Sequence, residues 1–333
     1  MGDRSMRDLR TLPKAHLHLH LEGGMRQSTL AELSERYALP PPPEPDGTFA
    51  TFIRTYRAAC DGLRTPEELH RLVHEVVQDA ANDGAVWIEP QDWITIGMAE
   101  RAGLADEEAV LRVLLEALAE AARAIGIGAG LMVATNRQRP IDQAEALARL
   151  AARYAGRGVV SFGLVDDETV GPEPFADAFA IARAAGLISA PHGGELAGPE
   201  RVWGALDALK AQRVQHGVRS VEDPSLLEHL AQEQVCLDVC LTSNVYLGVV
   251  PNIAAHPLPK LLAAGIPVSL NTDDPLVFGS TLLTEYELAR DVFGLDDTAL
   301  AGIAASSIRH SGAPASLKAT ALAGVQRWLE LPA

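Results

Sequence analysis

The sequence predicts an α/β protein that folds as one (β/α)8 barrel, also called a TIM barrel. Two observations favour this class: short β-like runs alternate with amphipathic helical patterns along almost the whole chain, and there are eight such runs. Eight parallel strands is the number that closes a barrel. A doubly wound open sheet is the alternative, but the phosphate-binding loops typical of such sheets, GxGxxG and GxxxxGKS/T, do not occur in the sequence.

The expected strands are short runs dominated by apolar residues. In chain order they are Ala15–Leu21, Ala85–Glu89, Gly128–Ala134, Val159–Val165, Leu187–His192, Arg213–His216, Val235–Leu241 and Pro267–Asn271. Apolar residues that recur every three or four positions indicate amphipathic helices between them. These helices are expected at Pro66–Asn82, Asp106–Ile125, Ile141–Tyr154, Pro174–Ala185, Pro199–Leu209 and Asp223–Glu233.

Helix-end signals and a proline-rich segment complete this outline. Asp106 is expected to cap the N-terminus of its helix, and Gly126 is expected to end it. We expect a single domain over residues 1–333, with residues 28–82 as a largely helical insertion after the first strand. The segment Pro40–Asp46, PPPPEPD, predicts a stiff polyproline II connection at the surface, and a docking site for a partner is the alternative.

The charge balance excludes several classes of function. The chain has 28 basic and 44 acidic residues, a formal net charge of −16. Nucleic-acid-binding proteins and proteins that dock on anionic membranes are normally basic, so we expect neither partner. The N-terminal sequence lacks the apolar run of a signal peptide, and Cys60, Cys236 and Cys240 are typical of reduced thiols. We therefore expect a cytoplasmic protein.

The first expected strand carries three alternating histidines. Because successive strand residues point to opposite faces, His16, His18 and His20 share the face opposite the leucines. A strand rises ~3.3 Å per residue, so His16 and His20 lie about 13 Å apart and cannot bind one ion. Active sites of such barrels lie at the carboxyl ends of the strands. This selects His18 and His20 as metal ligands and leaves His16 as a deeper, structural residue.

Three other expected strands also end in residues suited to metal or proton chemistry. They contribute His192 and Glu195 in APHGGE, His216 in VQHG, and Asp273 and Asp274 in SLNTDDP. His18, His20, His192 and Asp273 offer three nitrogens and one oxygen, a set that suits Zn²⁺ with water as a further ligand. His216 and Glu195 remain for proton transfer. Because zinc lowers the pKa of bound water toward ~7, the pattern predicts hydrolytic attack on an electrophilic carbon.

At these residues the chain resembles the adenosine deaminase branch of the amidohydrolase superfamily. The matching segments run from Leu12 to about Trp328 and keep the family's order: LPKAHLHLHLEG, TPEELHRLVHEVVQDAANDGAVWIEP, APHGGE, RVQHG and SLNTDDP. The resemblance implies the (β/α)8 barrel of metal-dependent hydrolases with one zinc ion per subunit. It also implies the ligand set His18, His20, His192 and Asp273.

The resemblance further implies a role for each remaining site residue. His216 matches the histidine that orients and deprotonates the metal-bound water. Glu195 matches the acid that protonates purine N1, and Asp274 matches the carboxyl that hydrogen-bonds N7. Protonation of N1 makes C6 electrophilic, so hydroxide adds there and ammonia leaves.

The residues at the sugar end of the substrate depart from the family pattern. Glu22 stands where many adenosine deaminases have an aspartate that contacts the ribose 5′-hydroxyl. Asp166 stands in place of the glycine whose N–H meets purine N3. We expect substrate contacts from Asp274, His20, Glu22 and Asp166. The expected substrate is adenosine or a related 6-aminopurine nucleoside; free adenine and the 5′-modified nucleoside aminodeoxyfutalosine of the menaquinone pathway are the alternatives.

Two other functions are weighed against this one. A hydrolase of esters or amides on the same scaffold often uses two metals and a bridging lysine, but no lysine occurs between Lys14 and Lys210. A catalytically inactive binding protein would have to keep all six catalytic positions by accident. The acidic site favours an uncharged purine base or nucleoside over a phosphorylated nucleotide. The sequence leaves open the oligomeric state and the choice of zinc over iron or manganese.

Overall fold

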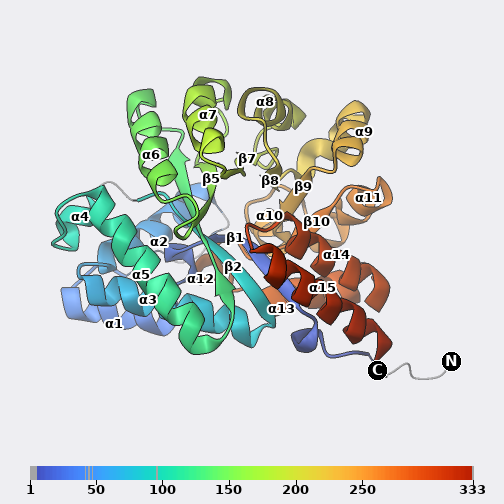
Figure 1. The fold of residues 1–333 in the computed structure, drawn as a ribbon, viewed down its shortest axis with the longest axis horizontal. Helices are drawn as coiled ribbons and strands as arrows, with labels where there is room; N and C mark the ends of the chain where they lie inside the picture. Colours follow the sequence, from blue (N-terminus) through green and yellow to red (C-terminus); the bar gives the residue numbers. More distant parts are fainter. Residues whose placement is uncertain (1–5, 42, 44–45, 47, 95–96, 332–333) are drawn as a thin grey trace.

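The computed structural model describes residues 6–331 except 42, 44, 45, 47, 95 and 96. Parallel strands lie at the centre and helices surround them, as a (β/α)8 barrel requires (Figure 1). The predicted fold class is confirmed. The strands are β1 (Lys14–His20), β2 (Ala85–Asp92), β3 (Gly128–Ala129), β4 (Leu131–Asn136), β5 (Val159–Val165), β6 (Ile188–Ser189), β7 (His192–Gly193), β8 (Arg213–His216), β9 (Cys236–Val239) and β10 (Val268–Leu270).

The strands form two parallel sheets that join into a ring. One sheet has the order β1-β2-β4-β5-β6, with β3 also paired to β2, and the other has the order β10-β9-β8-β7. Asp273, just after β10, joins them: its N–H donates to the His18 carbonyl at 3.1 Å, and its carbonyl accepts from the His20 N–H at 3.0 Å. This closure brings the first and last strands of the chain together.

Two expected strands are each split in the structure. Leu187–His192 is divided into β6 and β7 around Pro191, which has no N–H to donate to a neighbouring strand. Gly128–Ala134 is divided into β3 and β4 at Gly130. A Cβ atom on Gly130 would lie 2.6 Å from Val160 Cγ1, so no larger side chain fits there without displacing that valine.

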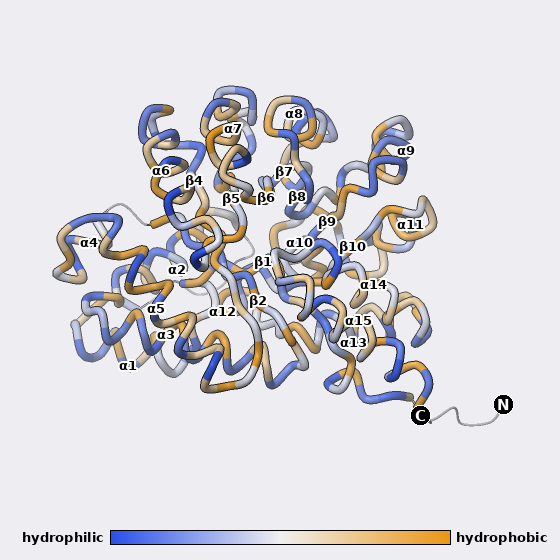
Figure 2. Tube along the Cα trace, in the orientation of Figure 1, coloured by the Kyte–Doolittle hydropathy of each residue, from blue (hydrophilic) through white to orange (hydrophobic). Residues whose placement is uncertain are grey.

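The helices cover the outside of the ring, and hydrophobic and hydrophilic residues alternate along them (Figure 2). They are α1 (Gln27–Tyr37), α2 (Phe49–Gly62), α3 (Pro66–Asn82), α4 (Met98–Arg101), α5 (Glu107–Ile125), α6 (Ile141–Arg153), α7 (Ala176–Ala184), α8 (Pro199–Leu209), α9 (Pro224–Glu233), α10 (Leu241–Tyr246), α11 (Leu258–Ala263), α12 (Pro275–Phe278), α13 (Leu282–Asp291), α14 (Asp297–His310) and α15 (Ala315–Glu330). No helix within the described residues is both long and apolar enough to span a membrane.

Helix ends follow local capping chemistry. The side chain of Thr65 accepts a hydrogen bond from the Glu68 N–H, and the Glu68 carboxylate accepts one from the Thr65 N–H, so α3 begins at a capping box. The Asp106 carboxylate accepts from the Ala109 N–H at 2.8 Å and begins α5. Gly126, with φ of +90°, ends α5. The predicted cap and stop of this helix are therefore confirmed.

The segment between β1 and β2 is mostly helical. It contains α1, α2 and α3, and the α3 helix packs on α5 and β2. The division of the chain into one domain with residues 28–82 as an insertion stays a prediction. The Pro40–Asp46 prediction falls partly outside the described residues, because residues 42, 44 and 45 are not described.

Alternation along β1 separates the core from the site. Leu17 and Leu19 are buried in the hydrophobic core between strands and helices. His18 and His20 point to the opposite, inner side of the ring. His16 is also buried, and its Nε2 lies 2.9 Å from the Thr272 hydroxyl, so this ring has a hydrogen-bond partner away from the other histidines.

Candidate active site

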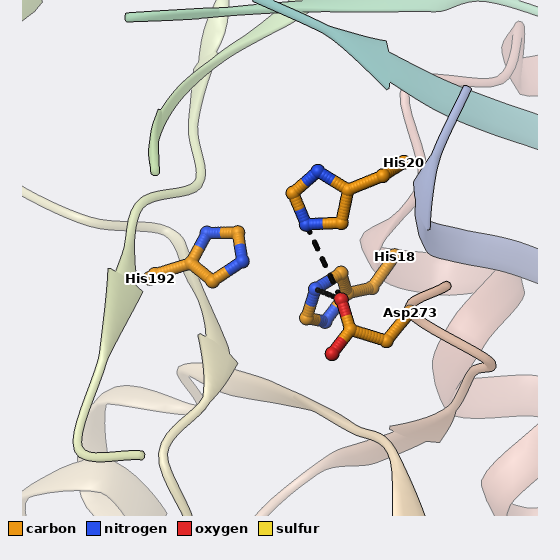
Figure 3. Close-up of side chains that lie close together, drawn as sticks. All are labelled: His18, His20, His192 and Asp273. Atoms are coloured by element: carbon orange, nitrogen blue, oxygen red, sulfur yellow. Dashed lines mark ion pairs between the residues drawn. The ribbon is translucent and has the colours of Figure 1, made fainter. Parts of the chain in front are cut away.

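Three histidines and one aspartate converge inside the barrel. His18 and His20 come from β1, His192 begins β7, and Asp273 follows β10 (Figure 3). One potential ligand atom from each residue lies within 4.8 Å of those of the other three. The Nε2 atoms of His18 and His20 are each 3.2 Å from Asp273 Oδ1. The structure therefore brings together the four residues that we expected to hold a metal.

Hydrogen bonds to backbone carbonyls orient two of these rings. His18 Nδ1 donates to the Asp238 carbonyl and His192 Nδ1 donates to the Leu164 carbonyl, each at 3.1 Å. Because a neutral imidazole carries one proton, the Nε2 lone pair of each ring is free to bind a metal. Among the described residues, the buried Nε2 of His18 has no hydrogen bond of good geometry; Asp273 Oδ1, at 3.2 Å, belongs to the same cluster of potential ligands. A buried nitrogen of this kind fits a metal ligand.

The electrostatics of the cluster agree with that fit. Burial, followed by the neighbouring histidines, lowers the pKa of His192 well below its usual value, which keeps its ring neutral. Burial opposes charge on Asp273, but His18 and His20 outweigh it and hold the pKa of that carboxyl well below its usual range. A neutral His192 and an ionised Asp273 are the protonation states that metal binding requires of these two residues.

Glu195 stands beside the cluster in surroundings that favour its protonated carboxyl. It is buried, and burial raises the pKa of its carboxyl well above the usual value, with further contributions from the charges of Asp273 and Glu168. The Glu168 carboxylate accepts the backbone N–H of Glu195, at 3.2 Å, and that of Ala197, at 2.8 Å, which fixes the loop after β7. A carboxyl that stays protonated near neutral pH can act as a general acid.

His216 lies at the end of β8, beside Glu195 and Asp273. Its Nε2 is 3.5 Å from Glu195 Oε1 and 3.8 Å from Asp273 Oδ2. His216 and Asp273 have φ of +63° and +61°, and Asp166, at the end of β5, has φ of +81°. Residues with a Cβ adopt this left-handed region at a cost, and such strain is concentrated at functional sites.

A cavity of about 290 Å³ opens onto this cluster. Its lining includes His20, His192, Glu195, His216 and Asp273 on the inner side and Asp166 at the end of β5. The α2 helix supplies one wall through Phe52, Ile53, Tyr56 and Arg57. The volume and the mixture of apolar walls with a few polar groups are typical of small-molecule sites.

Two of the residues expected to bind substrate do not line this cavity. Glu22 is fully buried, and its Oε2 accepts a hydrogen bond from the Tyr56 hydroxyl at 2.7 Å. Trp93 Nε1 donates to the same hydroxyl at 3.1 Å, so Tyr56 and Trp93 stand between Glu22 and the cavity. Asp274 is also fully buried, packed against Gly23.

Asp274 and Asp166 differ in their access to the cavity. Burial raises the pKa of Asp274 well above its usual value, and the neighbouring Asp273 charge adds to the effect. Asp166 lines the cavity, but its carboxylate accepts from Asn136 Nδ2 at 2.6 Å and from the Asp167 N–H at 2.7 Å. The substrate contacts of Asp274, His20, Glu22 and Asp166 stay predictions.

Several residues near the site were missed by the sequence analysis. Tyr56 lies on α2, and Trp93 lies just after β2 and donates a hydrogen bond to it. Asn244 hydrogen-bonds His216, and His256 hydrogen-bonds Asn244. Asn244 follows a strand end in the segment TSN, a position that favours functional residues in such barrels. Trp93 also follows directly after a strand, whereas Tyr56 and His256 had no comparable signal, because a helix and a loop remote in sequence bring them to the site.

A (β/α)8 barrel that gathers three histidines and an aspartate at the carboxyl ends of its strands defines a class of hydrolytic enzymes, the amidohydrolases. The adenosine deaminase family model matches residues 13–328, so the chain belongs to the adenosine deaminase family. The predicted resemblance is confirmed. The protein is a hydrolytic deaminase of adenosine, adenine or a related purine, in a family of metal-dependent enzymes.

Individual relatives agree with this assignment over almost their full lengths. A putative adenosine/adenine deaminase of Streptomyces coelicolor is 46% identical over 342 residues, which cover 97% of this chain and 98% of the relative. An aminodeoxyfutalosine deaminase of Streptomyces avermitilis is 36% identical over 329 residues, with 95% and 91% covered.

Solved structures show the same fold. The crystal structure of adenine deaminase from Arthrobacter aurescens has a TM-score of 0.88 and 31% identity, with 96% of this chain and 99% of that chain covered. An amidohydrolase from Burkholderia ambifaria, solved with bound Zn, has a TM-score of 0.85 and 26% identity, with 97% and 93% covered.

Proposed function

We propose that this protein is a zinc-dependent deaminase that converts adenosine or a related 6-aminopurine nucleoside to the 6-oxopurine and ammonia. The observation that carries the proposal is the position of the buried Glu195 carboxyl beside four converging potential metal ligands. His18, His20, His192 and Asp273 would hold one zinc ion per subunit, as three nitrogens and one oxygen suit that metal. The amidohydrolase relative with bound Zn supports this choice. When bound, the zinc supplies Lewis acidity that makes hydroxide available near neutral pH.

The side chains of the protein provide the proton chemistry. Glu195 donates its carboxyl proton to purine N1, which withdraws electrons from C6 and makes that carbon electrophilic. Burial raises the pKa of Asp274, which favours the protonated carboxyl that a hydrogen bond to the acceptor N7 needs; because Asp274 does not line the cavity, its side chain would have to turn toward the purine. His216 lies within 4 Å of both Glu195 and Asp273 and orients the attacking oxygen. Together these groups hold a 6-aminopurine by its N1 and N7 edges.

Free adenine is the second candidate substrate, and a specific contact favours it. Glu22 is the residue at the expected 5′-hydroxyl position, yet Tyr56 occupies its Oε2 and separates it from the cavity. A nucleoside would have to displace Tyr56 to reach this carboxylate, whereas the free base needs no contact there. The adenine deaminase among the solved structures supports the same candidate. The aminodeoxyfutalosine deaminase relative keeps a 5′-modified nucleoside as an alternative.

Ammonia release tests the proposal directly. The zinc-loaded enzyme would be assayed with adenosine, deoxyadenosine, adenine, methylthioadenosine and aminodeoxyfutalosine, and with the Glu195→Gln variant as the control for background hydrolysis. We expect release from at least one 6-aminopurine, and the ratio of kcat/KM for adenosine to that for adenine decides between the two candidates. Absence of release from all five compounds would contradict the proposed function. Full activity with tightly bound iron or manganese and no zinc would contradict the metal assignment.

A further inference from the structure

A chain of three hydrogen bonds runs from a backbone amide to the active-site ring of His216. The Leu258 N–H donates to His256 Nδ1 at 3.0 Å. His256 Nε2 lies 3.1 Å from Asn244 Oδ1. Asn244 Nδ2 lies 3.2 Å from His216 Nδ1. This series of hydrogen bonds therefore approaches His216 from α10 and from the loop before α11, on the side of the ring that faces away from the cavity.

Only one direction of hydrogen bonding satisfies every atom in this chain. A backbone N–H can only donate, so His256 Nδ1 accepts and its single proton is on Nε2. That proton is donated to Asn244 Oδ1, which places the amide NH2 of Asn244 toward His216. Because His216 Nδ1 then accepts, the ring proton of neutral His216 is on Nε2.

Burial makes this direction hard to reverse. Asn244, His216 and His256 are 0%, 1% and 3% exposed, so water cannot easily replace a lost partner. Burial also lowers the pKa of His256 to about 4, which keeps the ring neutral, as an accepting Nδ1 requires. Rotation of the Asn244 amide would place its NH2 group against the Nε2–H of His256 and its carbonyl oxygen against the unprotonated Nδ1 of His216. Unsatisfied buried groups of this kind are costly, because the low dielectric strengthens their repulsion.

We propose that Asn244 and His256 are positioning residues that fix His216 as the Nε2–H tautomer and make it a hydrogen-bond donor at the reacting centre. The Nε2–H group lies between Glu195 Oε1, at 3.5 Å, and Asp273 Oδ2, at 3.8 Å. An oxygen placed between these groups receives a hydrogen bond from His216. The resting ring therefore orients the attacking oxygen, and Nε2 has no free lone pair with which to remove a proton from it.

The inference rests on the proposed function only for the identity of that oxygen. The direction of the hydrogen bonds follows from the described contacts alone. It also refines the role that the family resemblance implies for His216, which is to orient and to deprotonate the metal-bound water. The hydrogen-bond relay, Leu258 N–H to His256 to Asn244 to His216, supports the orienting role in the resting enzyme.

Nitrogen NMR of histidine-labelled, zinc-loaded enzyme measures the tautomer without reference to activity. The His216 signals would be assigned by their loss in His216→Gln. We expect wild-type His216 to show a protonated Nε2 and an unprotonated Nδ1. Observation of the proton on Nδ1 would overturn the proposal. If no purine is deaminated by the wild-type enzyme, the proposed function fails, but the NMR result still decides the tautomer.

Substitution of Asn244 should reverse the hydrogen bond between residue 244 and His216. In Asn244→Asp the carboxylate can only accept, so the proton of His216 should move to Nδ1. We expect kcat to fall by about 100-fold, within the range for a lost proton-transfer or orienting group, with zinc content near that of the wild type and a lower Tm, because the new carboxylate is fully buried. An unchanged tautomer together with near-wild-type kcat in this variant would refute the positioning role.

Two variants of His256 keep the test decisive if Asn244→Asp fails to fold. The amide nitrogen of His256→Gln can replace Nε2–H as the donor to Asn244, whereas His256→Leu removes the donor. We expect His256→Leu to lower kcat about tenfold and to show a mixture of His216 tautomers, and His256→Gln to restore most of both. The matched control is His74→Leu, the same substitution at an exposed histidine on α3. Equal effects of the Gln and Leu variants would indicate a packing role and contradict the relay.

Discussion

Glu285 on α13 offers a quantitative test of the electrostatics behind the active site. This carboxylate is fully buried and accepts the Leu241 N–H at 2.7 Å, the Thr242 N–H at 3.3 Å, and the Thr242 hydroxyl. These contacts hold the N-terminus of α10, the helix that carries Asn244. Burial raises the pKa of Glu285 to about 7, although the hydrogen bonds from Thr242 and Leu241 oppose the shift. We predict that Glu285→Gln stabilises the protein at high pH.

The sign and size of the effect follow from linkage. A pKa raised from 4.5 to about 7 means that folding favours the neutral carboxyl. The stability contributed by Glu285 is fully present below pH ~4.5 and is lost as the pH rises through about 7. Between pH 5 and pH 8 this loss amounts to roughly 2.5 kcal/mol, at 1.36 kcal/mol per pH unit. Glutamine does not titrate, so the variant escapes this loss.

The amide can also keep the local hydrogen bonds. Its oxygen can accept the Leu241 N–H, and its NH2 group can donate to the Thr242 hydroxyl, which also accepts. Urea unfolding of the wild type and the variant, with equal zinc content, gives the free energy of unfolding at pH 5 and pH 8. We expect the free energy of unfolding of the variant, relative to that of the wild type, to increase by roughly 2.5 kcal/mol between pH 5 and pH 8. Exposed Glu233→Gln is the control for removal of one charge.

Two outcomes would refute the reasoning. If the stability difference between Glu285→Gln and the wild type stayed constant from pH 5 to pH 8, Glu285 would not titrate in this range. If the free energy of unfolding of Glu233→Gln, relative to the wild type, rose by the same amount from pH 5 to pH 8, the effect would come from net charge and not from burial.

Three further predictions concern the site and its support. Glu195→Gln should lower kcat by about 10²–10⁴ with zinc content and Tm retained, because it removes a general acid; near-wild-type turnover would exclude this proton donor. His192→Ala should lose metal, and elemental analysis that shows full zinc occupancy would mean the ligand set is wrong. Arg213, fully buried, pairs with Glu89 at 2.8 Å and Asp238 at 3.1 Å. Arg213→Met should therefore lower the free energy of unfolding by about 3–5 kcal/mol, because two buried carboxylates lose their cation, and a change below about 1 kcal/mol in urea unfolding would contradict this role.

The fold was predictable because its signals are periodic and local. Val159–Val165 and Arg213–His216 were expected as strands and occur with those bounds, and the α3 and α8 helices also have their expected bounds. Capping residues mark helix ends within a few positions of the chain, as Thr65 shows. The splits at Gly130 and Pro191 were not predicted, because they depend on which neighbour each residue meets in the ring.

The residues that converge at the site were predictable for a different reason. Strand alternation and the rule that barrel sites lie at the carboxyl ends of strands select positions such as His18 and Asp273 without a structure. No such rule applies to Tyr56, which reaches Glu22 from a helix 34 residues away in sequence. The same holds for His256, which reaches the site through Asn244.

The sequence by itself determined the barrel, the family and the residue types able to bind a metal, because these depend on periodicity and on motifs within single strand ends. Tertiary structure alone decided how those residues are used. It buried Glu195 and so raised the pKa of its carboxyl, placed Tyr56 in front of Glu22, and set the direction of the hydrogen bonds that reach His216. Each of these outcomes depends on the dielectric and the partners at a point in space, and the chain reaches that point only after closure of the ring.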